Sequence, residues 1–226
     1  MDEPVYYYAP RPPRWYETVT GRIVCLNILM FIVQIWLDDA EKEFTYTWAL
    51  SLPGLREGHW WQLLTFQVLH GGPIHLLINC LLIHVLGRAL EEHIGKLRLL
   101  VAYWLGGVAG GLLEMGIKWY WPEEFNSAIL GASAGACALV GVFATLFPRQ
   151  RLRVLIFFVI PVAMTARTML LVSIAFSVVG MTGVIPDGIA HAGHLGGIIW
   201  GILYTWLRLR QYMPPPPMSP PPLPYP

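Results

Sequence analysis

Charged residues are scarce in this chain. Of its 226 residues, 13% are Asp, Glu, Lys or Arg, whereas 55% are hydrophobic. Soluble domains carry roughly 25% charged residues, so this composition argues against an ordinary soluble protein and indicates lipid as the solvent for much of the chain. The length fits one domain. The formal net charge of +1 carries no information as a total, and we expect no nucleic-acid partner.

Cysteine is rarer still. Cys25, Cys80 and Cys137 each lie inside an apolar run, and their odd number and wide spacing argue against a disulfide framework. We expect them to act as small hydrophobic side chains. We also expect no cleavable signal peptide, because residues 1–20 contain no apolar core.

Long apolar runs, by contrast, recur along the chain. A helix needs about 20 mostly apolar residues to cross a bilayer. Six segments approach this length, at 21–37, 73–90, 99–117, 129–147, 168–185 and 188–207. The run 152–163 is shorter and contains Pro161, so we interpret it as an interfacial or re-entrant piece. The sequence therefore predicts an all-α fold, a polytopic membrane protein with a bundle of six transmembrane helices.

The basic residues orient this bundle. Lys42 and Arg56 fall between the first and second spans, and Lys118 falls between the third and fourth. All the others lie at the opposite end, which the positive-inside rule assigns to the cytoplasm. We therefore predict a cytoplasmic N-terminal segment (1–20), a membrane domain (21–208) and a Pro-rich, disordered cytoplasmic tail (209–226).

Polar residues inside membrane spans are functional candidates, and three groups of them share the outer end of the predicted bundle. His75 and Asn79 are four residues apart and so point from one helix face. Ser133 follows Gly131 at the start of an apolar helix, where unpaired backbone N–H groups favour an oxyanion. A serine among small residues can equally support helix packing.

A histidine on the last span favours the catalytic interpretation of Ser133. His194 lies on one helical stripe with Gly197 and Gly201, and glycine stripes let membrane helices approach closely. Packing this stripe against the helix of Ser133 would place an imidazole base beside a hydroxyl nucleophile. His75, Asn79 and the Ser133 N–H would then stabilise the oxyanion. His191, on the same face, is the alternative base, but it lacks the two glycines at this spacing.

Carboxylates have no obvious place in the predicted site. Asp187 precedes His194 by about two helical turns, so we predict a serine–histidine dyad rather than a triad. We interpret Glu114 as a cap at the outer end of the bundle. We interpret His70 and Glu91 as structural residues that are satisfied by hydrogen bonds.

With these residues in place, the sequence resembles the rhomboid family of intramembrane serine proteases over residues 20–208. The resemblance rests on His75 and Asn79 as the family's His-x-x-x-Asn, on Gly131-Ala132-Ser133, and on His194 with Gly197 and Gly201. It departs from the family pattern at Gln62, Ala134 and Cys137, where an arginine, a glycine and an aromatic residue are usual.

The resemblance implies that Ser133 is the nucleophile, that His194 is the base, and that His75 and Asn79 form the oxyanion hole. It implies peptide-bond hydrolysis within or beside a helix-destabilised transmembrane segment of a substrate protein, without metal or other cofactor. A chain of this size suits the bacterial cytoplasmic membrane. Two alternatives are a catalytically inactive rhomboid-like protein that binds membrane clients, and a metal-binding protein that uses His70, His75, His191 and His194.

Overall fold

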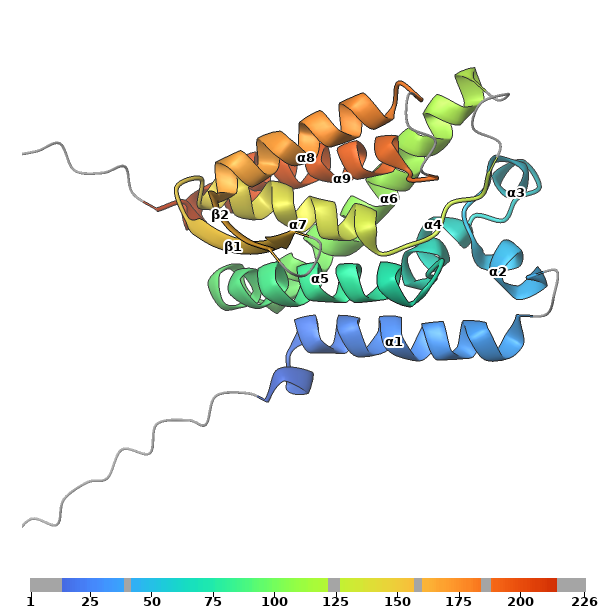
Figure 1. Ribbon diagram of the computed structural model, residues 1–226, viewed down its shortest axis with the longest axis horizontal. Helices are drawn as coiled ribbons and strands as arrows, with labels where there is room; N and C mark the ends of the chain where they lie inside the picture. Colours follow the sequence, from blue (N-terminus) through green and yellow to red (C-terminus); the bar gives the residue numbers. More distant parts are fainter. Residues whose placement is uncertain (1–13, 39–41, 122–126, 157–159, 184–187, 215–226) are drawn as a thin grey trace, which may run out of the picture.

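The computed structural model describes residues 14–38, 42–121, 127–156, 160–183 and 188–214. Within these ranges, six helices of fourteen or more residues form the body of the molecule, and successive ones run in alternating directions (Figure 1). They are α1 (Val19–Leu37), α5 (Pro73–Ile94), α6 (Lys96–Tyr120), α7 (Ser133–Leu146), α8 (Ala166–Gly180) and α9 (His191–Tyr204).

Short elements join these helices. The connection from α1 to α5 holds α2 (Glu43–Trp48), α3 (Leu52–Arg56), α4 (Gln62–Thr65) and η2 (Phe66–Val68). The turn η1 (Trp15–Glu17) precedes α1, and α9 continues through η3 (Thr205–Leu209) and η4 (Arg210–Tyr212). Three of the described helices, α1, α5 and α6, are long and apolar enough to cross a membrane, while α7 and α8 are apolar but shorter.

The six long helices fall on the six predicted spans, but the span predicted to begin at residue 129 becomes helical only at Ser133. The backbone just before Ser133 makes hydrogen bonds to the loop between α1 and α5 instead of joining the helix. Ile129 and Leu50 exchange two backbone hydrogen bonds, and the Gly131 N–H donates to the carbonyl of Phe66. Irregular backbone is tolerated at membrane depth where protein satisfies its polar groups. The loop between α1 and α5 therefore supports the entry into α7.

The prediction of an all-α chain was wrong at residues 152–163. Strands β1 (Arg151–Ile156) and β2 (Ile160–Thr165) form an antiparallel hairpin, with Arg151 opposite Thr165 and Ile156 opposite Ile160. The strands are rich in β-branched residues, which favour extended backbone. Pro161, which cannot donate a backbone hydrogen bond, is tolerated because each strand of a two-stranded ladder has an open edge. The hairpin leaves α7 and enters α8 at the same end of the bundle (Figure 1).

Helix α7 is the centre of the molecule. Eleven of its fourteen residues are buried, and α5, α6, α8 and α9 all pack on it. The outer surface is apolar, with exposed side chains such as Ile32 and Ile35 of α1 and Leu171 and Val179 of α8. A large apolar surface on a soluble monomer would be unusual, so this pattern suits a bundle surrounded by lipid.

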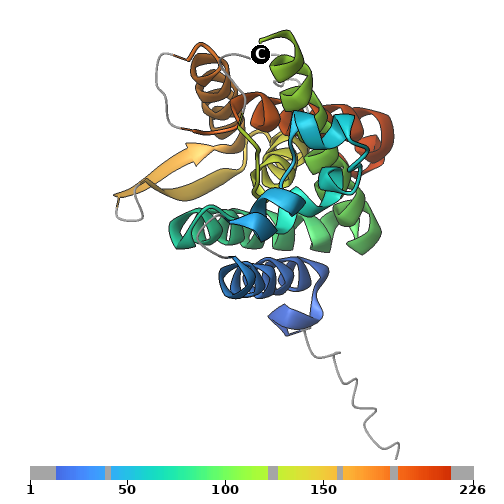
Figure 2. The same ribbon diagram turned by 90° about the vertical axis from the view of Figure 1, so that its right-hand side faces the viewer.

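Helix α1 lies along α5 at the edge of the bundle (Figures 1 and 2). Its first turn is capped by Glu91 of α5, whose carboxylate accepts hydrogen bonds of 2.9 Å from the backbone N–H groups of Val19 and Thr20. The Thr20 hydroxyl donates a third, of 2.8 Å. Glu91 is buried, and an anion at a helix N-terminus is stabilising. The structural interpretation of Glu91 is thus confirmed.

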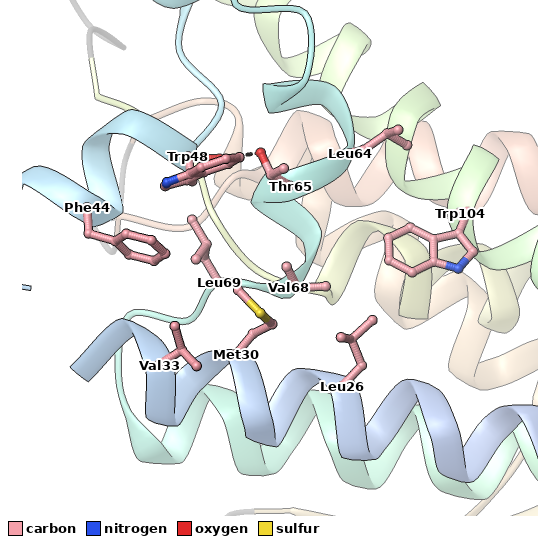
Figure 3. A pocket seen from close by; sticks show the side chains of 10 residues that line it. All are labelled: Leu26, Met30, Val33, Phe44, Trp48, Leu64, Thr65, Val68, Leu69 and Trp104. Atoms are coloured by element: carbon pink, nitrogen blue, oxygen red, sulfur yellow. Dashed lines mark hydrogen bonds between the residues drawn. The ribbon is translucent and has the colours of Figure 1, made fainter. Parts of the chain in front are cut away.

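An apolar cavity of about 770 Å³ separates part of α1 from the short helices that follow it (Figure 3). Its walls include Leu26 and Met30 of α1, Trp48 of α2 and Trp104 of α6. The hydroxyl of Thr65, which also lines it, donates to the carbonyl of Trp48 at 2.7 Å. None of His75, Asn79, Ser133 and His194 is among the residues that line it.

The chain after α9 is held against the α5–α6 junction as far as Tyr212. The Nε2 atom of His93 lies 2.7 Å from the Tyr212 carbonyl oxygen, and the Arg98 guanidinium lies 5.1 Å from the centre of the tyrosine ring. The predicted Pro-rich tail from residue 215 onward lies outside the described residues, as do residues 1–13 of the predicted N-terminal segment.

Candidate active site

Ser133 and His194 meet at one end of the bundle. Ser133 is the first residue of α7, and His194 lies in the first turn of α9. The Nε2 atom of His194 is 2.8 Å from Ser133 Oγ, a hydrogen-bond distance at which an imidazole can remove a hydroxyl proton. Both side chains are only partly buried. The pair therefore has the geometry that nucleophilic catalysis requires.

Glycines on α9 make this approach possible. A Cβ atom on Gly197 would lie 2.1 Å from the Ala134 carbonyl oxygen, and one on Gly201 would lie 2.1 Å from that of Ala138. The two backbones are thus in direct contact, in the small-residue packing typical of membrane helices. The structure thus packs the predicted glycine stripe against the helix of Ser133. On α7 the contact runs along the backbone of Ala134 and Ala138.

His75 lies beside the same serine. A Cβ atom on Gly131 would fall 2.7 Å from His75 Cε1 and 3.7 Å from Ser133 Oγ, and the φ angle of Gly131 is +129°. Only glycine fits this position without strain. The Gly71 N–H points to His75 Nδ1 at 3.3 Å. In the neutral ring this leaves the proton on Nε2, the nitrogen that faces Gly131.

Asn79 lies one turn further along α5 and is buried. Its Nδ2 atom has no hydrogen-bond partner within the described part of the chain. Such a donor is costly to bury unless something accepts from it. Asn79 and His75 thus both carry N–H groups on α5, one helical turn apart, and His75 lies beside Gly131. Their role at an oxyanion stays a prediction.

His70 packs against His75, with 5.2 Å between the ring centres. Its backbone N–H and carbonyl both bond to the side chain of Gln34, each at 3.0 Å. The backbone of His70 thus makes hydrogen bonds of the kind expected for a structural residue. Burial, and to a smaller extent the neighbouring His75, lowers the pKa of His70 to about 4.

His191, the alternative base, lies away from Ser133. Its ring fills the space above Gly180 of α8, where an added Cβ would come within 2.1 Å of it. The ring also lies 5.0 Å from that of Phe176. His191 therefore joins α8 to α9, and His194 is the histidine that contacts the serine. Asp187, the rejected triad candidate, lies outside the described residues.

Two departures from the rhomboid pattern are accommodated. The Ala134 methyl lies in space left by Gly110 of α6, where a Cβ would fall 2.7 Å from it. Gln62 is buried and bridges the loop, because its amide accepts from the Ser51 N–H and donates to the Thr47 carbonyl, each at 3.1 Å.

Within the described residues, no group of three or more His, Cys, Asp or Glu side chains is placed to hold a metal ion. The histidines of the metal-binding alternative separate into two pairs, His70 with His75 and His191 with His194.

One contact near the site was not predicted. The Glu114 carboxylate of α6 accepts a hydrogen bond of 2.9 Å from the N–H of Gly193, the residue next to His194. Lys118, one turn later on α6, lies 3.7 Å from the same carboxylate and donates to the Ser127 carbonyl. The sequence predicts a capping role for Glu114 at the outer end of the bundle but no partner for it, and the structure provides Gly193. The i, i+4 spacing of opposite charges in an apolar helix was the signal for the pair.

A serine–histidine pair at one end of a helical bundle with an apolar surface defines a class of candidate membrane hydrolases. The comparison with known families is more specific, because the family model of the Rhomboid domain matches residues 57–211. The chain belongs to the rhomboid family, which makes it an integral, multi-pass membrane protein with a mostly helical bundle. The resemblance seen in the sequence is thereby confirmed.

Several curated relatives support this assignment. The rhomboid-family protein YdcA of Bacillus subtilis is 30% identical over 160 residues, which cover 70% of this chain and 72% of YdcA. Rhomboid protease AarA of Providencia stuartii is 27% identical, with 83% of this chain and 71% of AarA covered. Rhomboid protease GluP of Bacillus subtilis is 28% identical over 81% of this chain, which spans only 33% of GluP.

Proposed function

We propose that this protein is an intramembrane serine endopeptidase that cleaves transmembrane or juxtamembrane segments of other membrane proteins. The observation that carries the proposal is the 2.8 Å contact between Ser133 Oγ and His194 Nε2, located where the first turn of α7 offers unpaired N–H groups. A hydroxyl, a base and nearby hydrogen-bond donors are the parts that acyl transfer needs.

The proposed reaction begins with attack of Ser133 Oγ on the carbonyl carbon of the scissile peptide bond, while His194 Nε2 takes the hydroxyl proton. The tetrahedral oxyanion accepts hydrogen bonds from the Ser133 N–H, His75 Nε2–H and Asn79 Nδ2–H. The C–N bond then breaks, and His194 returns the proton to the leaving amine. Water, activated by the same imidazole, hydrolyses the acyl-enzyme and regenerates Ser133.

The position of the pair suggests the substrate class. Ser133 begins α7 in a bundle whose outer surface is apolar, so a peptide bond must reach it from within or just above the bilayer. A helical carbonyl is already hydrogen-bonded, so a substrate segment with reduced helix stability is the better fit.

In the proposed topology all six long helices span the membrane, both chain ends face the cytoplasm and the site faces outward. This follows from the basic residues at the end opposite Ser133. The bacterial cytoplasmic membrane is the membrane we propose.

Cleavage of a single-span reporter protein by the purified protein in liposomes tests the proposal. We expect cleavage by the wild type and a fall of at least about 10³-fold in Ser133→Ala and His194→Ala. The matched control is His191→Ala, which removes an imidazole on the same helix and should leave most activity. A serine-directed fluorophosphonate should label the wild type but not Ser133→Ala.

A second candidate is a client-binding protein without activity, because the family includes members named as inactive. The hydrogen-bonded Ser133–His194 pair favours the enzyme. A wild type that neither cleaves several reporters nor reacts with the fluorophosphonate, but that binds single-span proteins, would reverse this preference.

A further inference from the structure

Helix α6 carries a buried ion pair at the same end of the bundle as the candidate active site. Glu114 and Lys118 are 5% and 4% exposed, and Lys118 Nζ lies 3.7 Å from Glu114 Oε1. Removing two charges from water is expensive, and an apolar pair of similar volume is often as stable or more stable. Stability alone therefore gives no reason for charges at these two positions, and their other contacts are more informative.

The contact of Glu114 is with the helix that carries the base. The N-cap residue of α9 is Ala190, whose side chain makes no capping hydrogen bond. The Glu114 carboxylate caps this helix from outside, because its Oε2 atom accepts from the Gly193 N–H at 2.9 Å. A carboxylate is favoured at this position by the helix dipole. Gly193 is bonded directly to His194, so the cap acts one residue from the imidazole.

The contact of Lys118 is with the chain that leads to the nucleophile. Its ammonium group donates to the Ser127 carbonyl, in the chain that leads into α7 at Ser133. Helix α6 also contacts α7 and α9 directly. A Cβ on Gly110 would fall 2.3 Å from the Gly193 carbonyl oxygen and 2.7 Å from Ala134 Cβ. One turn of α6 therefore contacts the entries of both α7 and α9.

From these contacts we propose, on the basis of the proposed proteolytic function, that Glu114 is a positioning residue for the Ser133–His194 pair. Its carboxylate holds the first turn of α9 in the orientation that directs His194 Nε2 at Ser133 Oγ, and Lys118 neutralises that carboxylate while holding the segment before Ser133. Glu114 acts through the backbone of α9 and takes no part in proton transfer. It provides the orientation that the third member of a triad provides elsewhere.

Two double variants separate positioning from simple stability. Glu114→Gln with Lys118→Met removes both charges but keeps an amide oxygen that can accept from Gly193. Glu114→Leu with Lys118→Met removes both charges and the acceptor. Neither leaves an unpaired buried charge, and both lack the Lys118 contact, so their difference isolates the hydrogen bond to Gly193. The measurements are kcat and KM for the reporter in liposomes, the rate of fluorophosphonate labelling and the melting temperature.

We expect the Leu/Met variant to have a kcat about tenfold or more below that of the Gln/Met variant, with KM little changed and labelling slowed in parallel, because small misplacements of catalytic groups cost large factors in rate. Equal kcat values, or a loss that only follows a lower folded fraction, would overturn the inference. A wild type that neither cleaves nor labels would overturn the proposed function and the inference with it. If the wild type is active and the two double variants have equal kcat values, only the inference about Glu114 is overturned.

Discussion

Helices α7 and α8 are neighbours of almost equal length and similar apolar composition, yet they are packed in opposite ways. In α7 eleven of fourteen residues are buried, whereas in α8 three of fifteen are buried. The contacts with α9 differ too. Those of α7 join backbone to backbone at Gly197 and Gly201, while that of α8 passes through the His191 ring over Gly180.

The difference shows that hydropathy alone does not distinguish a central helix from a peripheral one. Both sequences satisfy the same apolar pattern, but only α7 is rich in Gly and Ala, which let neighbouring backbones approach from several sides. The helix that begins with Ser133 is therefore the more constrained of the two. The following predictions test this contrast, from the largest expected effect to the smallest.

The strongest test truncates one leucine in each helix. Leu139 of α7 is 1% exposed and Leu171 of α8 is 55% exposed. We expect Leu139→Ala to lower the free energy of unfolding by about 2–5 kcal/mol through cavity formation, and Leu171→Ala to change it by about 0.5 kcal/mol or less. Thermal unfolding in detergent measures both. Equal losses would mean that α8 is packed as tightly as α7.

The direct contact between the backbones of α7 and α9 is tested by substituting two helical glycines that differ in their surroundings. A Cβ on Gly197 would lie 2.1 Å from a carbonyl oxygen, whereas one on Gly116 of α6 would meet nothing within 4 Å. Gly197→Ala should cost about 3 kcal/mol, at the upper end for overpacking, and should also impair cleavage. Gly116→Ala should be neutral or stabilising by up to about 1 kcal/mol. If Gly197→Ala changed neither stability nor cleavage, α7 and α9 could move apart at this contact without cost.

A pH titration of stability probes the loop that supports α7. Burial lowers the pKa of His70 to about 4, while its value in the unfolded chain is about 6.5. Between these values the unfolded state binds more protons, so stability falls as the pH is lowered. From pH 7 to pH 5 the loss attributable to His70 is about 2 kcal/mol. His70→Gln should flatten this part of the profile, and an unchanged slope would assign the titration to other groups.

The smallest effect is expected where α8 meets α9. Gly180→Ala introduces a Cβ within 2.1 Å of the His191 ring, but a side chain moves more easily than a backbone carbonyl. We expect a loss of about 1 kcal/mol, below that of Gly197→Ala. Both variants can be compared in one melting series. A larger loss for Gly180→Ala would reverse the contrast between the two helices.

Sequence reasoning located the six long helices, because a helix depends on local spacing, and it predicted the contact between Ser133 and His194 from a helical stripe. The roles of the site residues remain predictions. The four-residue interval from His75 to Asn79 and the stripe through His194, Gly197 and Gly201 follow from helical geometry. The same reasoning failed at the β1–β2 hairpin, since a short apolar run does not reveal whether it forms strand or helix.

Two long-range features were also beyond the sequence alone. The start of α7 at Ser133 depends on hydrogen bonds to Leu50 and Phe66, which are distant in the chain. Glu114 and Gly193 are 79 residues apart in the sequence, so no local pattern predicts their contact. In both cases the partner of a backbone group lies far away in the sequence.

The cap that Glu91 provides for α1 has a consequence for biosynthesis. The Val19 N–H and its acceptor are separated by 72 residues, and translation at about 5–20 residues per second delays the carboxylate by several seconds. Helix α1 thus emerges from the ribosome before the acceptor for its Val19 and Thr20 N–H groups exists. It can complete the capping of its first turn only after α5 has been made.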